Sequence, residues 1–322
     1  MTDKKRVLIP IPVNAPAEEY LTAHGYEVVS GTPTDAAWLK EHIGEYDAAV
    51  IRGTHITADI LEAGLPRLKL IARHGIGCDN VDVAAATRLG IQVTFTPAAS
   101  TNAVAEHTMA LILALAKEVI PGDRMTKAGQ WAAFRRDYEG VELMSSTLGL
   151  IGVGRIGTNV AKAAAYGFGM KVIAYDPYAD PRKTDPCIEL LDSREAVLEQ
   201  ADFVSVHMPL TEETRGSIGQ SFLSRMKKGA FLINTSRGEI VNEPELAAAL
   251  RRHEIRGAAL DVYCTEPLPA DNLFRELDNV ICSAHFATIT GATLDRLALH
   301  SAVSVDEVLS GMEISWPVNH LS

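Results

Sequence analysis

The sequence predicts an α/β protein made of two doubly wound domains, each built around a parallel sheet. The chain has 322 residues, 47% of them hydrophobic, which is about twice the usual length of ~150 residues for one domain. Short apolar runs alternate with stretches of helical periodicity, as in βα units that form parallel sheets. One long helical stretch near residue 110 divides this alternation into two series.

The first series covers about the first hundred residues. Helical patterns at 58–63 and 83–89 separate its last three strands, and Gly90 follows the second helix at a position that often ends one. The strands are expected at residues 7–9, 27–29, 48–51, 68–72 and 91–95. A connecting helix is expected over 101–119, ended by Pro121-Gly122.

The second series begins at Leu148 and has six expected strands. These are residues 148–152, 171–175, 203–206, 230–234, 257–261 and 280–282. Helices are expected at 156–166, 193–199 and 244–251, the last with Asn242 and Glu245 as a capping box. No strand follows the amphipathic stretch 291–309, which is therefore expected to return to the first domain. The predicted domains are residues 1–100 with 290–322, and residues 101–289.

Composition excludes several classes of function. The 41 acidic and 30 basic residues give a net charge of −11, without a basic block for nucleic acid. The four cysteines show no C-x-x-C pairing, so neither disulfides nor a thiolate metal site is expected, and a reducing cytoplasm fits best. Residues 4–17 faintly resemble a signal peptide, but the apolar stretch is short and contains Pro10 and Pro12, so a first strand is expected instead. No run reaches the ~18 apolar residues of a membrane span, so a soluble protein is expected.

A glycine-rich turn points to a dinucleotide. Gly152, Gly154 and Gly157 directly follow an apolar strand and open a helix. In this context the first glycine permits a tight turn, the second lets backbone approach a pyrophosphate, and the third lets the helix pack closely on the strand. Asp176 ends the next strand, where a carboxylate binds ribose hydroxyls and repels a 2′-phosphate, so NAD is expected rather than NADP. The alternative is a structural turn without a ligand.

Three further strands end in polar segments, where ligands of open α/β sheets gather. Reduction of a carbonyl by a nicotinamide needs a proton donor, a cation for a carboxylate and an acid to assist the donor. His285, Arg237 and Glu266 supply one of each. Taken singly, each has a structural explanation: a buried histidine, a surface ion pair and a turn acid before Pro267. Their joint placement at strand ends favours catalysis.

At this point the sequence resembles the D-isomer-specific 2-hydroxyacid dehydrogenases, over nearly the whole chain. The motifs that match are Arg73-x-Gly-x-Gly-x-Asp-Asn-Val-Asp82, Val104-Ala-Glu-His107, residues 148–157, Val206-His-x-Pro-Leu-Thr211, residues 234–238, Leu260-Asp-Val, Glu266-Pro and His285. The resemblance implies a flavodoxin-like substrate domain and a Rossmann NAD-binding domain, with substrate in the cleft between them. It also implies a homodimer, formed through the nucleotide-binding domains and the helix from Thr101.

The resemblance assigns roles to individual residues. Arg237, Glu266 and His285 are implied as the catalytic trio, with Asp261 near the nicotinamide carboxamide. The implied cofactor-binding residues are Gly152, Gly154, Arg155, Ile156, Gly157, Asp176, His207, Met208, Pro209, Thr235, Ser236, Arg237, Asp261, His285 and Ala287.

The substrate end is expected at Gly75-Ile76-Gly77, whose backbone N–H groups could hold a carboxylate. The alternative is a structural turn. Arg52 and Arg73 flank this turn and suggest a second anionic group on the substrate. Both resemble arginines at the phosphate end in the phosphoglycerate dehydrogenase branch of the family. In the same likeness, Arg135 and Arg136 approach the neighbouring subunit.

Some features depart from the family. His74 is unexpected beside the glycine turn, Ser283-Ala284 stands where a proline is common before the histidine, and Phe286 could narrow the pocket. The chain ends soon after its last helix, so no C-terminal regulatory domain is expected. Substrates without phosphate, such as glyoxylate, hydroxypyruvate or D-lactate, remain an alternative. So do an NAD-sensing corepressor-like protein and a formate or phosphite dehydrogenase.

Overall fold

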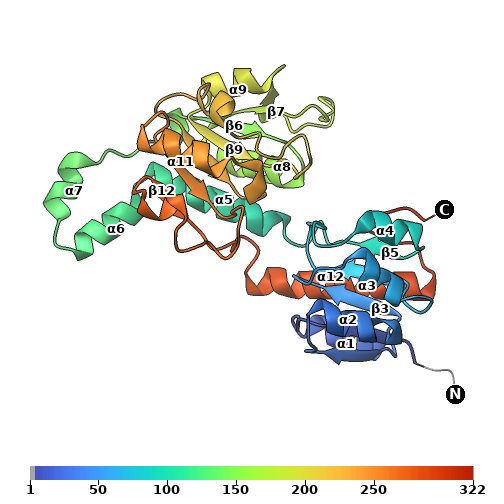
Figure 1. Cartoon of the computed structure of the whole chain (residues 1–322). Helices are drawn as coiled ribbons and strands as arrows, with labels where there is room; N and C mark the ends of the chain where they lie inside the picture. Colours follow the sequence, from blue (N-terminus) through green and yellow to red (C-terminus); the bar gives the residue numbers. More distant parts are fainter. Residues whose placement is uncertain (1–3, 322) are drawn as a thin grey trace. The chain divides into compact units, whose positions relative to one another are not determined.

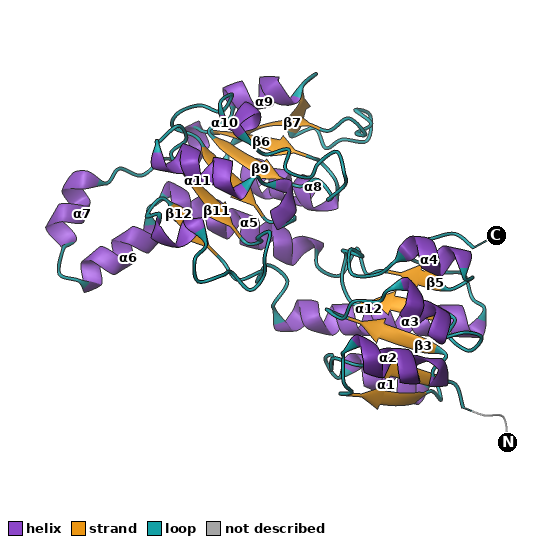
Figure 2. Cartoon of the chain, in the orientation of Figure 1, coloured by secondary structure: helices purple, strands orange, loops and turns teal. Residues whose placement is uncertain are grey.

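The computed structural model describes residues 4–321 and divides into two compact units (Figure 1). One unit contains the chain up to Ser100 together with the segment that starts at Thr288. The other contains Thr101–Ala287. Each unit has its own parallel sheet and its own buried core, and Figure 2 shows helices on both faces of each sheet.

The first unit has a five-stranded parallel sheet in the order β2-β1-β3-β4-β5. Its strands are β1 (Arg6–Ile9), β2 (Glu27–Ser30), β3 (Ala48–Ile51), β4 (Leu70–Arg73) and β5 (Gln92–Thr94). Its helices are α1 (Pro16–Ala23), α2 (Ala36–His42), α3 (Ala58–Ala63), α4 (Val83–Arg88) and α12 (Gly291–Ser310), with a 3-10 turn η1 (Ile43–Glu45).

Helices cover both faces of this sheet, and its central strands β1, β3 and β4 are mainly apolar and buried. All four residues of β3 are buried, and alternate side chains enter different cores. Ala49 and Ile51 pack with residues of α2, α3 and α4, whereas Ala48 and Val50 pack with residues of α1 and α12. Because helices cover the two faces, ligands can reach the sheet at the carboxyl ends of its strands. At this edge β4 leads into the turn at Gly75.

The second unit has a seven-stranded parallel sheet in the order β12-β11-β10-β9-β6-β7-β8. Its strands are β6 (Thr147–Ile151), β7 (Lys171–Tyr175), β8 (Ile188–Leu190), β9 (Phe203–Val206), β10 (Phe231–Asn234), β11 (Gly257–Leu260) and β12 (Val280–Cys282). Its helices are α5 (Thr101–Ala116), α6 (Val119–Lys127), α7 (Trp131–Asp137), α8 (Arg155–Lys162), α9 (Arg194–Gln200), α10 (Gln220–Leu223) and α11 (Glu243–Arg251). Shorter helical turns are η2 (Leu143–Ser145), η3 (Ala163–Gly167), η4 (Gly238–Ile240) and η5 (Leu273–Glu276).

The strand orders confirm the predicted fold class. The first sheet has the 2-1-3-4-5 order of flavodoxin-like sheets. Counted from β6, the second has the dinucleotide-binding order 3-2-1-4-5-6 with β12 added as a seventh strand. In the second sheet β6 lies between β7 and β9, so the chain reverses its direction of winding beside β6. Ligands of such sheets bind at this switch point.

The predicted connecting helix differs from the observed one. α5 ends at Ala116, Glu118 takes a left-handed conformation with φ 52°, and a separate helix α6 begins at Val119. Pro121 and Gly122 were expected to end the helix but lie inside α6. Pro121 is tolerated there because it occupies the first turn, where an N–H has no helical partner.

A second difference lies behind the glycine turn of the second unit. The helix expected over 156–166 is α-helical only as Arg155–Lys162, and a π-helical turn, Ala163–Gly167, completes it. None of the helices within residues 4–321 combines the length and apolar character needed to cross a bilayer.

Candidate functional site

The glycine turn of the second unit connects β6 to α8 and is packed too tightly for side chains at two of its glycines. Gly152 has φ +98°, and a Cβ there would lie 2.7 Å from the backbone oxygen of His207. A Cβ on Gly157 would lie 2.4 Å from the Gly152 oxygen. By contrast, a Cβ on Gly154 would meet no atom within 4 Å. The turn is therefore closely packed at Gly152 and Gly157 and open at Gly154, which precedes the N-terminus of α8.

Asp176 lies at the end of β7 and organises this turn. Its Oδ2 accepts a hydrogen bond of 2.9 Å from the Val153 N–H, inside the glycine motif, and its Oδ1 accepts one of 2.9 Å from the Tyr178 N–H. The carboxylate thus sits beside the turn with its oxygens held by backbone. This is the position where an acid binds the ribose of a dinucleotide.

These observations fit a bound NAD. Open space above Gly154 faces the first N–H groups of α8, which have no partner within the helix and attract an anion. Thr235 and Ser236 follow β10 at the same edge of the sheet, and Thr235 Oγ1 lies 3.0 Å from Thr108 Oγ1. Met208 and Pro209 follow β9 and are partly buried and exposed, respectively. Their contacts with a cofactor stay a prediction.

His207 also follows β9, but its ring faces the protein. Its Nε2 lies 2.9 Å from Ser205 Oγ. Burial lowers the pKa of His207 to about 4, so the ring is neutral at neutral pH. Because its backbone oxygen lies against Gly152, His207 supports the turn from below.

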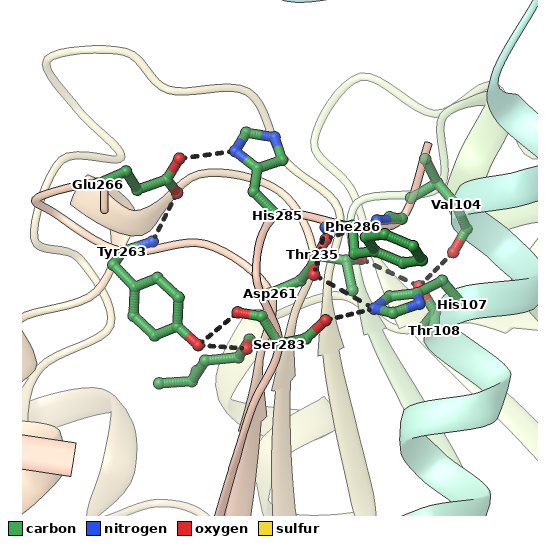
Figure 3. Close-up of polar contacts among 12 residues, drawn as sticks. Val104, His107, Thr108, Thr235, Asp261, Tyr263, Glu266, Ser283, His285 and Phe286 are labelled. Carbon is green, nitrogen blue, oxygen red and sulfur yellow. Dashed lines mark hydrogen bonds and ion pairs between the residues drawn. The ribbon is translucent and has the colours of Figure 1, made fainter. Parts of the chain in front are cut away.

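His285 and Glu266 form an acid–base pair beside the ends of β11 and β12 (Figure 3). The His285 Nδ1 lies 2.8 Å from Glu266 Oε2, and the other carboxylate oxygen accepts a 3.0 Å hydrogen bond from the Tyr263 N–H. The His285 side chain is 50% exposed and that of Glu266 is 35% exposed. The carboxylate therefore fixes one ring nitrogen while the imidazole stays accessible to a ligand.

The backbone that carries His285 is strained. His285 has φ 51°, a left-handed conformation that costs about 1–2 kcal/mol for a residue with a Cβ. Such a conformation persists only when its surroundings fix it. Here the carboxylate of Asp261 accepts hydrogen bonds of 2.9 Å and 3.1 Å from the N–H groups of Phe286 and Ala287. The Asp261 backbone oxygen accepts a third, of 2.8 Å, from the His285 N–H.

Asp261 is fully buried and ionised. Burial by itself raises the pKa of this carboxyl group, but hydrogen bonds from His107, the Phe286 N–H, Ser283 and the Ala287 N–H outweigh burial and lower it overall. The His107 Nε2 lies 3.2 Å from Asp261 Oδ1 and 3.2 Å from Ser283 Oγ. Sequence reasoning placed His107 in a matching motif without a role. A histidine on an otherwise apolar helix face was the available signal.

Arg237 lies in the loop after β10. Its Nη1 donates a 2.7 Å hydrogen bond to the Ser236 oxygen, and Asn234 ties the loop by donating 2.9 Å to the Arg237 oxygen. A Cβ on the next residue, Gly238, would lie 1.9 Å from the carbonyl carbon of Tyr263. This close approach packs the Arg237 loop against the segment that leads from β11 to Glu266.

Apart from Arg237, the residues expected to bind substrate lie in the first unit, around the turn after β4. Arg73 anchors this turn: its Nε donates 2.7 Å to the Gly77 oxygen, and its Nη1 donates 2.8 Å to the His74 oxygen and 3.2 Å to the Ile51 oxygen. Gly75 has φ +148° and donates from its N–H to Thr96 Oγ1. The N–H groups of Ile76 and Gly77 form no hydrogen bond within residues 4–321. Two adjacent backbone donors are thus left for an anion.

Arg52 directly follows β3 and is half-buried. Among the residues described, no carboxylate forms an ion pair with it. Its charge also acts on His74, which is 5% exposed. Burial, and next the Arg52 charge, lower the pKa of His74 to about 4. The ring is therefore neutral, and positive charge near the turn comes from the two arginines.

Each unit is a doubly wound α/β body, and the second has the features of a dinucleotide-binding unit with an acid–base pair at its strand ends. Comparison with known proteins agrees. The family described as "D-isomer specific 2-hydroxyacid dehydrogenase, NAD binding domain" matches residues 109–287. The chain belongs to this family.

Individual relatives support this membership. A D-3-phosphoglycerate dehydrogenase of Methanocaldococcus jannaschii is 40% identical over 95% of this chain and 58% of its own length. A TT0316 protein of Thermus thermophilus is 36% identical, with a TM-score of 0.89 over 98% of this chain and 100% of that one. A glyoxylate reductase of Paecilomyes thermophila is 27% identical, with a TM-score of 0.88 over 98% and 99%. The chain spans less than two thirds of the curated relatives it matches.

Proposed function

We propose that the protein is an NAD-dependent oxidoreductase that interconverts a D-2-hydroxy acid and its 2-oxo acid. The observation that carries this proposal is the 2.8 Å pair of His285 and Glu266. It lies at strand ends of the same unit that holds the glycine turn and Asp176. Family membership supports the same chemistry. No cluster of three metal-ligating side chains occurs within residues 4–321, and the proposal uses no metal.

The proposal gives this chain's residues distinct tasks. NAD, when bound, supplies or accepts the hydride at the substrate C2. Because Glu266 engages Nδ1 of His285, Nε2 is the nitrogen left to exchange a proton with the substrate oxygen. Glu266 holds the His285 ring in place through this contact. Arg237 binds the substrate carboxylate and polarises the carbonyl.

The first unit supplies anion recognition in this proposal. The N–H groups of Ile76 and Gly77 bind a carboxylate, and Arg73 holds that turn in shape. Arg52, which lacks a carboxylate partner among the described residues, faces a second anionic group on the substrate. Several curated relatives are D-3-phosphoglycerate dehydrogenases, which supports a phosphorylated hydroxy acid. The glyoxylate reductase likeness supports an unphosphorylated acid as second candidate.

The test is NADH oxidation by the purified protein with 3-phosphohydroxypyruvate, hydroxypyruvate, glyoxylate and pyruvate, repeated with NADPH. We expect the phosphorylated acid to give the highest kcat/KM and NADPH to fail. A smaller acid as the best substrate would reassign Arg52. No turnover with any acid, alongside tight NADH binding, would favour an NAD-sensing protein.

The variant His285→Ala tests the acid–base role. We expect turnover to fall at least ~100-fold, as for a lost general acid or base, while the NADH dissociation constant stays the same. Glu266→Gln keeps the hydrogen bond to Nδ1 but removes the charge, so we expect a smaller loss of turnover than in His285→Ala. Near-normal turnover of His285→Ala would contradict the assignment.

We also propose a cytoplasmic homodimer. Exposed apolar side chains on α6 and α7 support it, because Val119, Ile120 and Trp131 are 52%, 54% and 56% exposed. Light scattering of the wild type and of Ile120→Glu with Trp131→Glu tests this. We expect a dimer for the wild type and a monomer for the variant.

A further inference from the structure

The polar contacts below His285 extend beyond the acid–base pair to helix α5. Figure 3 shows His107 on this helix, with its ring directed at Asp261 and Ser283. Asp261 in turn holds the N–H groups of Phe286 and Ala287, the two residues after His285. The contacts therefore run from α5 through a buried carboxylate to the loop that carries the proton-exchanging histidine.

The geometry determines which nitrogen of His107 carries a hydrogen. An ionised carboxylate only accepts hydrogen bonds, so the 3.2 Å contact between His107 Nε2 and Asp261 Oδ1 is favourable only if Nε2 is protonated. The side chain of Asp261 is 1% exposed and that of His107 is 20% exposed. Water therefore cannot easily replace this donor at the carboxylate.

His107 also differs from the other donors to Asp261 in its origin. Ser283, Phe286 and Ala287 belong to the end of β12 and the loop itself, so they move together with His285. Among the described donors, His107 is the one that comes from a separate helix. It therefore fixes the carboxylate relative to the rest of the unit, and the left-handed backbone of His285 depends on that carboxylate.

We propose that His107 is a positioning residue, which places His285 for proton exchange by donating from Nε2 to Asp261. This inference rests on the proposed dehydrogenase function. His107 does not touch the acid–base pair. Loss of the His107 side chain leaves the buried Asp261 carboxylate with fewer hydrogen-bond donors. The carboxylate then holds the N–H groups of Phe286 and Ala287 less firmly, and the His285 imidazole is misplaced.

The test compares His107→Leu, which removes the donor, with His107→Gln, whose side-chain amide reaches a similar position and restores a donor. Glu106→Gln is the matched control, because Glu106 is the exposed neighbour on α5. We expect His107→Leu to lower kcat roughly tenfold to a hundredfold, as misplacement of a catalytic group does. The KM values for NADH and the oxo acid should change little. His107→Gln should recover most of kcat, and Glu106→Gln should match the wild type.

Hydrogen exchange gives a readout that does not need turnover. In the protein without cofactor, amides of the segment 285–288 should exchange faster in His107→Leu than in the wild type or His107→Gln. Unchanged exchange and unchanged kcat in a folded His107→Leu protein would overturn the inference. So would a rise in the KM for NADH at constant kcat. A wild type that turns over no acid would instead overturn the proposed function, while the exchange result would still test the contact.

Discussion

The two units each have a glycine turn after a buried parallel strand, yet the turns are held differently. In the first unit the guanidinium of Arg73 donates to the oxygens of His74 and Gly77, and no helix starts until Val83. In the second unit α8 starts within the turn itself, at Arg155. A turn held by a side chain offers a few local N–H donors, whereas a turn that opens a helix adds the helix dipole.

The two turns share one feature, a neutral histidine. Burial lowers the pKa of both His74 and His207 to about 4. His74 lies within the first turn, and His207 lies beneath the second. The two turns differ in the segment that follows the strand, which is a loop in the first unit and a helix in the second. That difference suits the first turn to a substrate carboxylate and the second to a pyrophosphate.

The largest expected effect separates two glycines of the second turn. Gly157→Ala places a Cβ 2.4 Å from the Gly152 oxygen, so we expect overpacking to cost roughly 1–3 kcal/mol of stability and to abolish NADH binding. Gly154→Ala has open space around its Cβ, so its melting temperature should match the wild type. Its NADH affinity should still fall roughly tenfold or more, because the methyl group occupies the approach of the pyrophosphate. Thermal unfolding and NADH fluorescence titration measure both. Equal melting temperatures for the two variants would contradict this account.

The next effect concerns the first turn. Arg73→Lys keeps the charge, but its single ammonium nitrogen cannot reproduce the fork of Nε and Nη1 that reaches three backbone oxygens. We expect the KM for the oxo acid to rise roughly tenfold, with NADH binding unchanged. Arg52→Lys serves as the comparison, since it keeps the charge and has no such turn to hold. An unchanged KM in Arg73→Lys would show that Arg73 acts by charge alone and not by holding the turn.

A third effect is expected at Asp176. Asp176→Ser removes the carboxylate that would bind the ribose, so we expect NADH affinity to fall and the preference for NADH over NADPH to shrink roughly tenfold to a hundredfold. The variant also loses two backbone hydrogen bonds, and a small drop in melting temperature should accompany it. Kinetics with both cofactors test this. An unchanged preference would remove Asp176 from ribose recognition.

A fourth effect is a dependence of stability on pH. An unfolded histidine titrates near pH 6.5, whereas His74 in the folded protein titrates at about 4. Between these values the unfolded state binds more protons, so this stabilisation is complete above pH 6.5 and is lost as the pH falls towards 4. From pH 7 to pH 5 the loss is about 2 kcal/mol. Urea unfolding at both pH values should show the stability difference between wild type and His74→Asn narrowing by that amount. His55→Asn, at an exposed position, should show no such change.

The sequence predicted both sheets except for β8, because most of their strands are short apolar runs, a local signal. The glycine motif, Asp176 and the residues of the acid–base pair were recognisable for the same reason. Contacts between residues far apart in the sequence could not be recognised in this way. Nothing in the sequence near His107 shows that it meets Asp261, and nothing near Arg73 shows that its guanidinium donates to backbone oxygens of its own turn. The break between α5 and α6 was missed because proline at the start of a helix and proline after its end give the same local pattern.

At His285 the proposed catalysis and the thermal stability of the protein favour different residues, because its left-handed backbone conformation is strained for any residue with a Cβ. Glycine adopts this conformation freely, so replacing the histidine by glycine should remove the strain and yield a protein that melts at a higher temperature but cannot exchange the proton. The residue that the proposed reaction requires is then one that the fold alone would not select. Selection for stability without selection for turnover should change this position early.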